Sequence, residues 1–188
     1  MDHNELQSET GPVYSDTVPL KWKVLKDTPD AAHVVQMNES TEEILRIFYV
    51  LDEYHAEPED EHNPLAQELK RIDFKVNLVL DLVGQILSNS LSIPAPVDMQ
   101  LSAQGIAWLN TKAPDVGDLI HMEIYLKPKF PRPINMYARV KSTDPVQTNL
   151  RIEAHFEYMS EQVSNWLEKI VFRQHRRMIA QTRHKAGV

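Results

Sequence analysis

The chain has 188 residues, a formal net charge of -7 and no cysteine. This length allows one domain with an appendage or two small domains. The missing cysteine excludes disulfides, thiol catalysis and thiolate zinc sites, and the acidic balance argues against a general nucleic-acid binder. The sequence shows neither a secretory leader nor an apolar run of transmembrane length, so we expect a cytoplasmic protein with no membrane insertion.

Residues 1–39 are predicted to form an N-terminal segment with little regular structure. The first 17 residues are polar and aperiodic, which is typical of disorder. Residues 18–25 alternate weakly between apolar and polar side chains and could form one short strand. Ser40 and Glu43 then have the spacing of a capping box, and apolar residues follow at helical spacing, which predicts a helix over about residues 40–55.

A second helix is predicted over about residues 63–88. Asn63 is a good N-cap, and Pro64 suits the first helical position. The apolar residues that follow are separated by alternating steps of four and three residues, as in a coiled-coil heptad. They are Leu65, Leu69, Ile72, Val76, Val79, Val83 and Ile86. A period of 3.5 residues keeps such a seam facing a partner helix along its whole length, so the pattern predicts self-association.

The side chains of the seam also indicate how many copies assemble. β-branched residues occur at both core positions of the heptad, which disfavours a two-stranded coil. Leu80, Leu82 and Leu87 add apolar area at the flanks of the seam. We therefore expect a homo-oligomer, with a tetramer favoured over a trimer, in which residues 40–89 form the helical oligomerisation region. The alternative is that the stripe packs only on the rest of its own chain.

From residue 90 onward the apolar period changes from that of a helix to that of a strand. Alternating segments near residues 97–102, 120–127, 134–141 and 150–158 predict half-buried strands of an antiparallel sheet. Several short strands at this spacing suggest a small barrel. A last helix begins near Ser160 and ends in a basic stretch. The predicted fold class is α+β: a heptad-patterned helical region, then a small antiparallel β-barrel with a C-terminal helix over residues 90–188.

Motifs for catalysis are missing from the sequence. Phosphate-cradling glycine loops and the nucleophile elbow of hydrolases are absent, and the histidines lack metalloprotease spacing. The nearest approach to a metal site is the group His55, Glu57, Glu59 and His62, which is better interpreted as an exposed acidic linker. We therefore expect a protein that is not an enzyme and that holds no metal and no resident cofactor.

The segment from Gln100 to Trp108, QLSAQGIAW, carries the most informative spacing. Ser102 and Gly105 form an S-x-x-G turn early in a small barrel that is followed by a partly basic helix. This order resembles a PilZ domain, a bacterial module best known as a receptor for cyclic di-GMP, over about Leu91 to Arg183. With the preceding heptad helix, the chain resembles the atypical PilZ proteins that add long helices and assemble as tetramers.

The resemblance implies a ligand site in two parts. One is [D/N]-x-S-x-x-G on the barrel face, which Ser102 and Gly105 match, with Gln100 where Asp or Asn is expected. The other is an R-x-x-x-R before the barrel, whose guanidinium groups grip phosphates and stack on guanine. This pair is missing, because Arg71 and Lys75 have its spacing but lie within the heptad helix. We therefore expect weak or absent binding of cyclic di-GMP. Turn chemistry also explains both matching residues, with a positive φ at Gly105.

Three functions are compatible with these features. The first is an oligomeric PilZ-like adaptor that presents repeated surfaces to a signalling or motility protein. The second is a functional cyclic di-GMP receptor that uses basic residues from elsewhere, with Arg173, Arg176 and Arg177 as candidate anion contacts. The third is a nucleic-acid binder that uses the basic C-terminal helix, against which the overall acidity of the chain argues.

Overall fold

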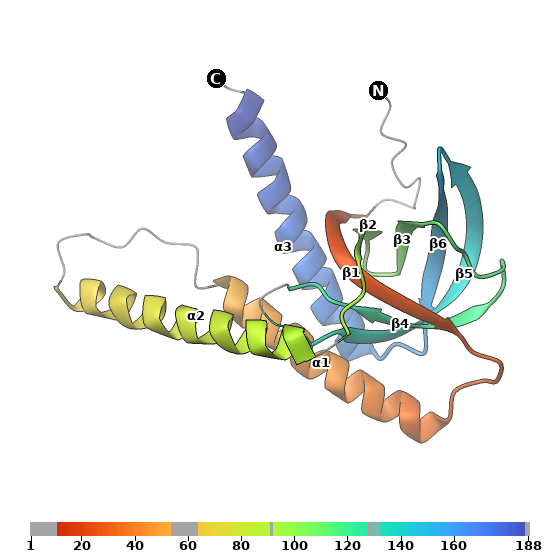
Figure 1. The fold of residues 1–188 in the computed structure, drawn as a ribbon, viewed down its shortest axis with the longest axis horizontal. Helices are drawn as coiled ribbons and strands as arrows, with labels where there is room; N and C mark the ends of the chain where they lie inside the picture. Colours follow the sequence, from red (N-terminus) through yellow and green to blue (C-terminus); the bar gives the residue numbers. More distant parts are fainter. Residues whose placement is uncertain (1–10, 54–63, 91, 128–129, 131, 187–188) are drawn as a thin grey trace.

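The computed structural model describes residues 11–53, 64–90, 92–127, 130 and 132–186 of the chain. A six-stranded barrel is flanked by three long helices, one of which points away from it (Figure 1). The elements in chain order are β1 (Tyr14–Val24), α1 (Ala31–Glu53), α2 (Pro64–Ser90), β2 (Pro96–Leu101), β3 (Gly105–Asn110), β4 (Leu119–Ile124), β5 (Ile134–Val146), β6 (Asn149–Glu157) and α3 (Glu161–Ala186). Among the helices so described, none has the length and apolarity to cross a bilayer.

The barrel closes through a strand from the N-terminal end of the chain. The strands follow one another around it in the order β1-β2-β3-β6-β5-β4, and all neighbouring pairs are antiparallel. Val18 of β1 lies opposite Val97 of β2, and Leu20 lies opposite Ile124 of β4. The predicted barrel over residues 90–188 was therefore incomplete, because it lacked the strand whose pairing removes both open edges. The first residues of β1 had been predicted to be disordered.

The predicted alternation of apolar and polar residues is confirmed in the other strands. In β4, for example, Ile120, Met122 and Ile124 are fully buried, while the residues between them are not. The prediction ended β5 too early, because this strand continues to Val146 and turns into β6 through only two residues. The first of these is Gln147, whose φ of 54° reverses the chain within that short loop.

Helix α1 begins earlier than the capping-box spacing predicted. Its first turn is capped by Asp30, whose Oδ2 atom accepts hydrogen bonds from the backbone N–H groups of Ala32 (3.0 Å) and His33 (3.3 Å). Ser40 and Glu43 therefore lie within the helix and cap nothing. The prediction was wrong because a second cap residue stands upstream, and because the apolar residues before Ser40 continue the same helical period.

Two buried polar side chains fix α1 on the rest of the molecule. Asn38 Nδ2 donates to the carbonyl oxygen of Tyr158 (2.8 Å), and Asn38 Oδ1 accepts from the N–H of Ser160 (2.8 Å) at the start of α3. Thr41 Oγ1 donates to the carbonyl oxygen of Asn135 in β5 (2.9 Å) and accepts from its N–H (3.2 Å). Because these groups are removed from water, they favour the one position of α1 in which all of them are bonded.

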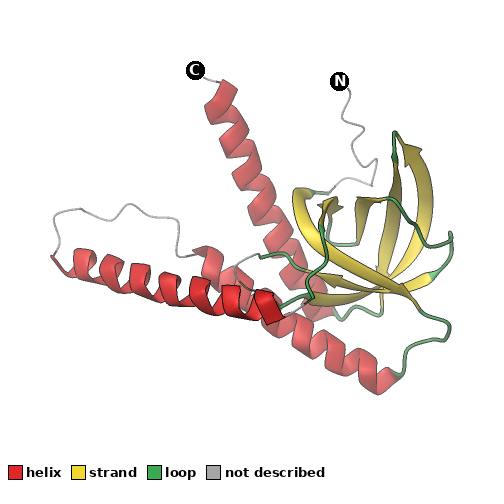
Figure 2. Ribbon diagram, in the orientation of Figure 1, coloured by secondary structure: helices red, strands yellow, loops and turns green. Residues whose placement is uncertain are grey.

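Apolar packing completes the attachment of the helices to the barrel. Leu45 and Phe48 of α1, and Leu167 and Val171 of α3, are fully buried in the same core as the inward side chains of the strands. Each such side chain contributes about 1.5–3 kcal/mol when it is completely buried. The two helices also contact each other, whereas most of α2 extends away from the other described elements (Figure 2).

Replacement of Asn38 by alanine should destabilise the fold. The substitution leaves the carbonyl oxygen of Tyr158 and the N–H of Ser160 buried without a partner, which costs about 1–3 kcal/mol. Urea denaturation followed by circular dichroism at one protein concentration measures the difference. Asn165→Ala, on the exposed side of α3, is the matched control and should change the midpoint little. Equal midpoints for the two variants would show that Asn38 does not anchor α1.

A histidine lies in the contact between α1 and the barrel. His121 of β4 packs beside Tyr137 of β5, with 5.5 Å between the ring centroids. Burial lowers its pKa from 6.5, and the nearby His33 and Lys21 act in the same direction. The charge of Glu123 and a hydrogen bond with Asn135 oppose the shift. Because protonated His121 is disfavoured in the folded state, the neutral ring stabilises the fold, and this contribution is lost as the pH falls below the unfolded value.

The variant His121→Phe should therefore be less sensitive to acid than the wild type. A phenylalanine keeps a ring beside Tyr137 but cannot take up a proton. Urea midpoints measured between about pH 7.5 and pH 5 should fall less steeply in the variant, because the wild-type histidine has a lower pKa folded than unfolded. If the two proteins lose stability in parallel over this range, His121 does not contribute to the pH dependence.

Candidate functional site

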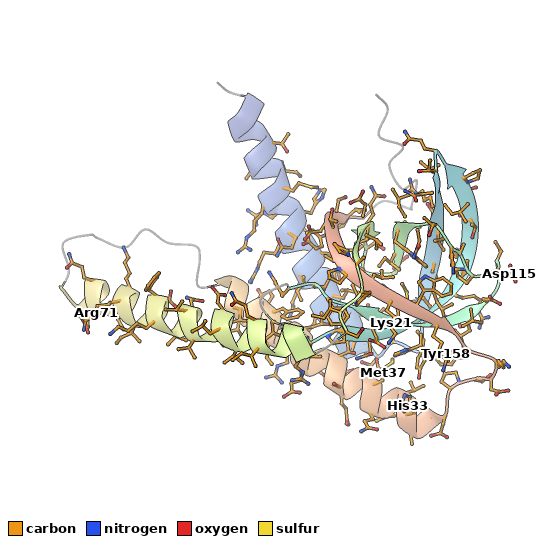
Figure 3. All side chains as sticks on the ribbon, viewed as in Figure 1. Lys21, His33, Met37, Arg71, Asp115 and Tyr158 are labelled. Carbon is orange, nitrogen blue, oxygen red and sulfur yellow. The ribbon has the colours of Figure 1, made fainter. Side chains whose placement is uncertain are left out.

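Helix α2 extends away from the barrel and exposes an apolar stripe. Figure 1 shows it running past the end of α1 into open space, and Figure 3 shows Arg71 near its outer end. The predicted start at Pro64 is confirmed. The seam side chains are about half exposed: Leu69 55%, Ile72 50%, Val76 51%, Val79 58%, Val83 47% and Ile86 68%. The side chains of Leu65 and Leu87 lie outside the described residues.

The seam faces away from its own chain. The least exposed described positions of α2 are Asn77, Asp81 and Gly84, which recur at helical spacing on the side opposite the seam. The described part of the chain therefore contradicts the alternative that the stripe packs on its own molecule. A row of large apolar side chains in solvent marks an interaction surface, since single chains rarely leave such a row uncovered.

The S-x-x-G segment forms the tight turn between β2 and β3. Ser102 Oγ donates to the carbonyl oxygen of Gly105 (3.1 Å) and accepts from the N–H groups of Gln104 (3.3 Å) and Gly105 (3.1 Å). The backbone N–H of Ser102 also donates to the same carbonyl oxygen (2.9 Å). The serine hydroxyl is thus fully engaged within the turn, as the turn interpretation predicts.

Gly105 is required for a different reason from the one predicted. Among the described glycines only Gly117 has a positive φ, so the expectation of a left-handed conformation at Gly105 was wrong. A Cβ atom at Gly105 would instead lie 2.4 Å from the carbonyl oxygen of Ala154 in β6. The glycine therefore allows β3 and β6 to approach each other closely.

Gln100 lies on the outer face of the barrel beside an arginine that the sequence did not single out. Arg151 Nη2 donates to Gln100 Oε1 (3.3 Å) and pairs with Glu153 Oε1 (3.1 Å). The Arg151 side chain is only 16% exposed. This guanidinium is the cation next to the S-x-x-G turn, but the carboxylate of Glu153 already neutralises it. Strand pairing alone brings the three residues together, which is why no sequence motif marks them.

The basic residues of α3 that were candidate anion contacts have other roles. Arg173 Nη1 donates to the carbonyl oxygen of Tyr49 in α1 (2.8 Å), and its guanidinium stacks on the Tyr49 ring at 3.5 Å from the centroid. Arg176 lies over Phe172 at 5.8 Å. Arg177 is half-buried. Arg173 thus joins α3 to α1, and the structure brings none of the three arginines to Ser102 or Gly105.

The described residues contain no group of three metal-ligating side chains. The weak metal candidates at His55, Glu57, Glu59 and His62 lie outside the described residues. A family model described as an atypical PilZ domain, cyclic di-GMP receptor, matches residues 45–184. This is most of the sequence, and the chain belongs to the atypical PilZ domain family.

A solved structure shares the whole arrangement. It is described as a pathogenic protein from Xanthomonas campestris with a new tetrameric PilZ domain, self-assembled via an unusual helical bundle. The likeness has a TM-score of 0.68 and 22% sequence identity, and it covers 90% of this chain and 91% of that one, which shows the fold. An inhibitor of motility from Bacillus subtilis matches 44% of this chain and 43% of its own, with 18% identity and a TM-score of 0.37. No curated protein shows a significant match.

Proposed function

We propose that this chain is a non-enzymatic, oligomeric signalling adaptor of the PilZ type, assembled through the seam of α2. The observation that carries the proposal is the row of half-exposed apolar side chains along a helix that its own chain leaves uncovered. Complete burial of a valine, leucine or isoleucine contributes about 1.5–3 kcal/mol, so helix pairing would recover several kcal/mol for each copy.

The distribution of apolar residues around α2 favours more than two copies. Leu80 and Leu82 flank the seam on its two sides and are 40% and 51% exposed. A pair of helices covers only the seam itself, whereas three or four helices also cover such flanking positions. The Xanthomonas campestris protein with the same fold is described as a tetramer formed by a helical bundle, which supports four copies here.

The ligand face supports weak or absent binding of cyclic di-GMP. A dinucleotide carries two phosphates, and its affinity depends on cations that are free to contact them. Beside the S-x-x-G turn, Arg151 is already paired with Glu153 and bonded to Gln100. The hydroxyl of Ser102 is already hydrogen-bonded within the turn. An assembly of four barrels would instead act by presenting the same surface repeatedly to a signalling or motility protein, which raises avidity without new contacts.

The substitution Val79→Asp tests assembly through the seam. A carboxylate at the centre of a helical bundle would be buried without a partner, so the mass by light scattering should fall from that of four chains to that of one. Val116→Asp is the matched control, because Val116 is equally exposed, 62% against 58%, but lies in a barrel loop. A wild-type protein that is already monomeric, or a Val79→Asp protein that keeps the wild-type mass, would refute the proposal.

Point substitutions are needed here because a truncated chain would not report on the seam. Deletion of residues 1–89 would remove β1 along with α1 and nearly all of α2. The barrel would then lose the strand that pairs with β2 and β4, and a changed mass could follow from misfolding alone.

Isothermal titration with cyclic di-GMP tests the ligand face. We expect no binding stronger than a dissociation constant of about 100 µM, because Arg151, which bonds to Gln100 just before the S-x-x-G turn, is already paired with Glu153. If the wild type binds in the low micromolar range, the variant Arg173→Ala/Arg176→Ala/Arg177→Ala identifies the source of the affinity. Such binding by the wild type would itself overturn the weak-binding proposal, and its loss in the variant would assign the affinity to these arginines.

A further inference from the structure

Helix α2 has a second uncovered surface on the side opposite its seam. Near the barrel this side carries Asn77, Asp81 and Gly84, which are half-buried or buried. Farther out it carries Lys70, Arg71, Phe74 and Leu78, all exposed, with Phe74 at 70% and Leu78 at 50%. We call these four residues the outer patch. Figure 3 shows its Arg71 far from the barrel.

Seam pairing does not account for the outer patch. In a bundle built on the seam positions, the residues on the opposite side of each helix remain in solvent. Phe74 and Leu78 would then expose a large apolar surface beside the basic side chains of Lys70 and Arg71. Arg71 is paired with Glu68 at 2.8 Å, but both side chains are more than half exposed, so this ion pair is weak and exchangeable. The patch has the composition of a contact with an acidic, partly apolar partner.

The chain itself offers a surface of that composition on α1. Val35, Glu39, Glu43, Arg46 and Val50 follow one another at steps of four, four, three and four residues, so they share one side of the helix. All five are exposed, and we call them the α1 stripe. Glu43 lies 3.9 Å from the Arg132 guanidinium, but this ion pair is exposed and therefore weak. The two valines of the stripe are 57% and 51% exposed, and its two glutamates outweigh the charge of Arg46.

We propose that the outer patch of one copy docks on the α1 stripe of a neighbouring copy in the assembled protein. In this contact the valines of the α1 stripe pack against Phe74 and Leu78. The glutamates of the stripe form ion pairs with Lys70 and Arg71. The proposal rests on the seam-based assembly, which brings neighbouring copies together. The contact is not made within one chain, because Asn38 and Thr41 hold α1 on the barrel and α2 projects beyond its end (Figure 1).

Charge reversal tests this contact. The variant Lys70→Glu/Arg71→Glu should assemble at a concentration at least tenfold higher than the wild type in about 0.1 M salt. The difference should shrink in about 1 M salt, where screening acts within a few ångströms. Analytical ultracentrifugation measures the midpoint of assembly, which is the protein concentration at which half of the chains are assembled. Lys26→Glu/Lys112→Glu, which changes two exposed lysines elsewhere, is the matched control and should behave as the wild type.

Mixing two variants then distinguishes a contact between copies from a contact within one copy. Glu39→Lys/Glu43→Lys should weaken assembly as Lys70→Glu/Arg71→Glu does. An equimolar mixture of these two proteins should recover the wild-type midpoint and form mixed oligomers, because each acidic patch then faces a basic stripe. A contact within one chain could not be restored by mixing, so absence of recovery would overturn the proposal.

The results for the outer patch can be distinguished from the results for the seam. If Val79→Asp dissociates the protein but Lys70→Glu/Arg71→Glu assembles with the wild-type midpoint, the seam is confirmed and the outer contact is refuted. If both variants keep the wild-type mass at all concentrations, both proposals fail. If the wild type binds a different acidic protein, and Lys70→Glu/Arg71→Glu loses that binding while its own assembly is unchanged, the patch serves another partner and the contact between copies is again refuted.

Discussion

The position of α1 depends on two buried polar side chains, and α3 is joined to α1. Asn38 and Thr41 bond to the junction before α3 and to β5, so a small shift of the helix would leave several buried groups without partners. Apolar contacts tolerate sliding much better than such bonds do. Arg173 joins α3 to the same helix. These polar bonds therefore fix the position of a helix that is otherwise held by apolar packing.

The two regions that the sequence singled out differ in how far the chain itself satisfies them. The turn at Ser102 keeps its geometry, because the serine and Gly105 satisfy requirements of the barrel itself. Arg151, which bonds to Gln100 before that turn, is paired with Glu153. On α2, by contrast, a row of large apolar side chains is about half exposed. The turn is therefore bonded within the chain, whereas the apolar row of α2 is not covered by it.

The sequence predicted correctly those features that depend on residues close to one another along the chain. The heptad spacing, the start of α2 at Pro64 and the alternating strands depend on neighbours a few residues apart, and the structure bears them out. The membership of β1 in the barrel could not be seen, because its partners in β2 and β4 are distant in sequence. The pairing of Arg151 with Gln100 has the same origin. The start of α1 was predicted wrongly for a local reason. Asp30 and Ser40 can each cap a helix, and Ser40 was chosen because it has the capping-box spacing.

The closure of the barrel by its first strand also affects how copies meet during synthesis. β3 can complete its pairing only when β6, which ends at Glu157, has left the ribosome. Helix α2 ends at Ser90 and emerges well before that moment. Parts of a protein fold in the order in which they leave the ribosome. Apolar surface that is exposed on a nascent chain associates readily with other apolar surface. Under the proposed assembly through the seam, chains translated side by side from one message would join through α2 while their barrels are still open.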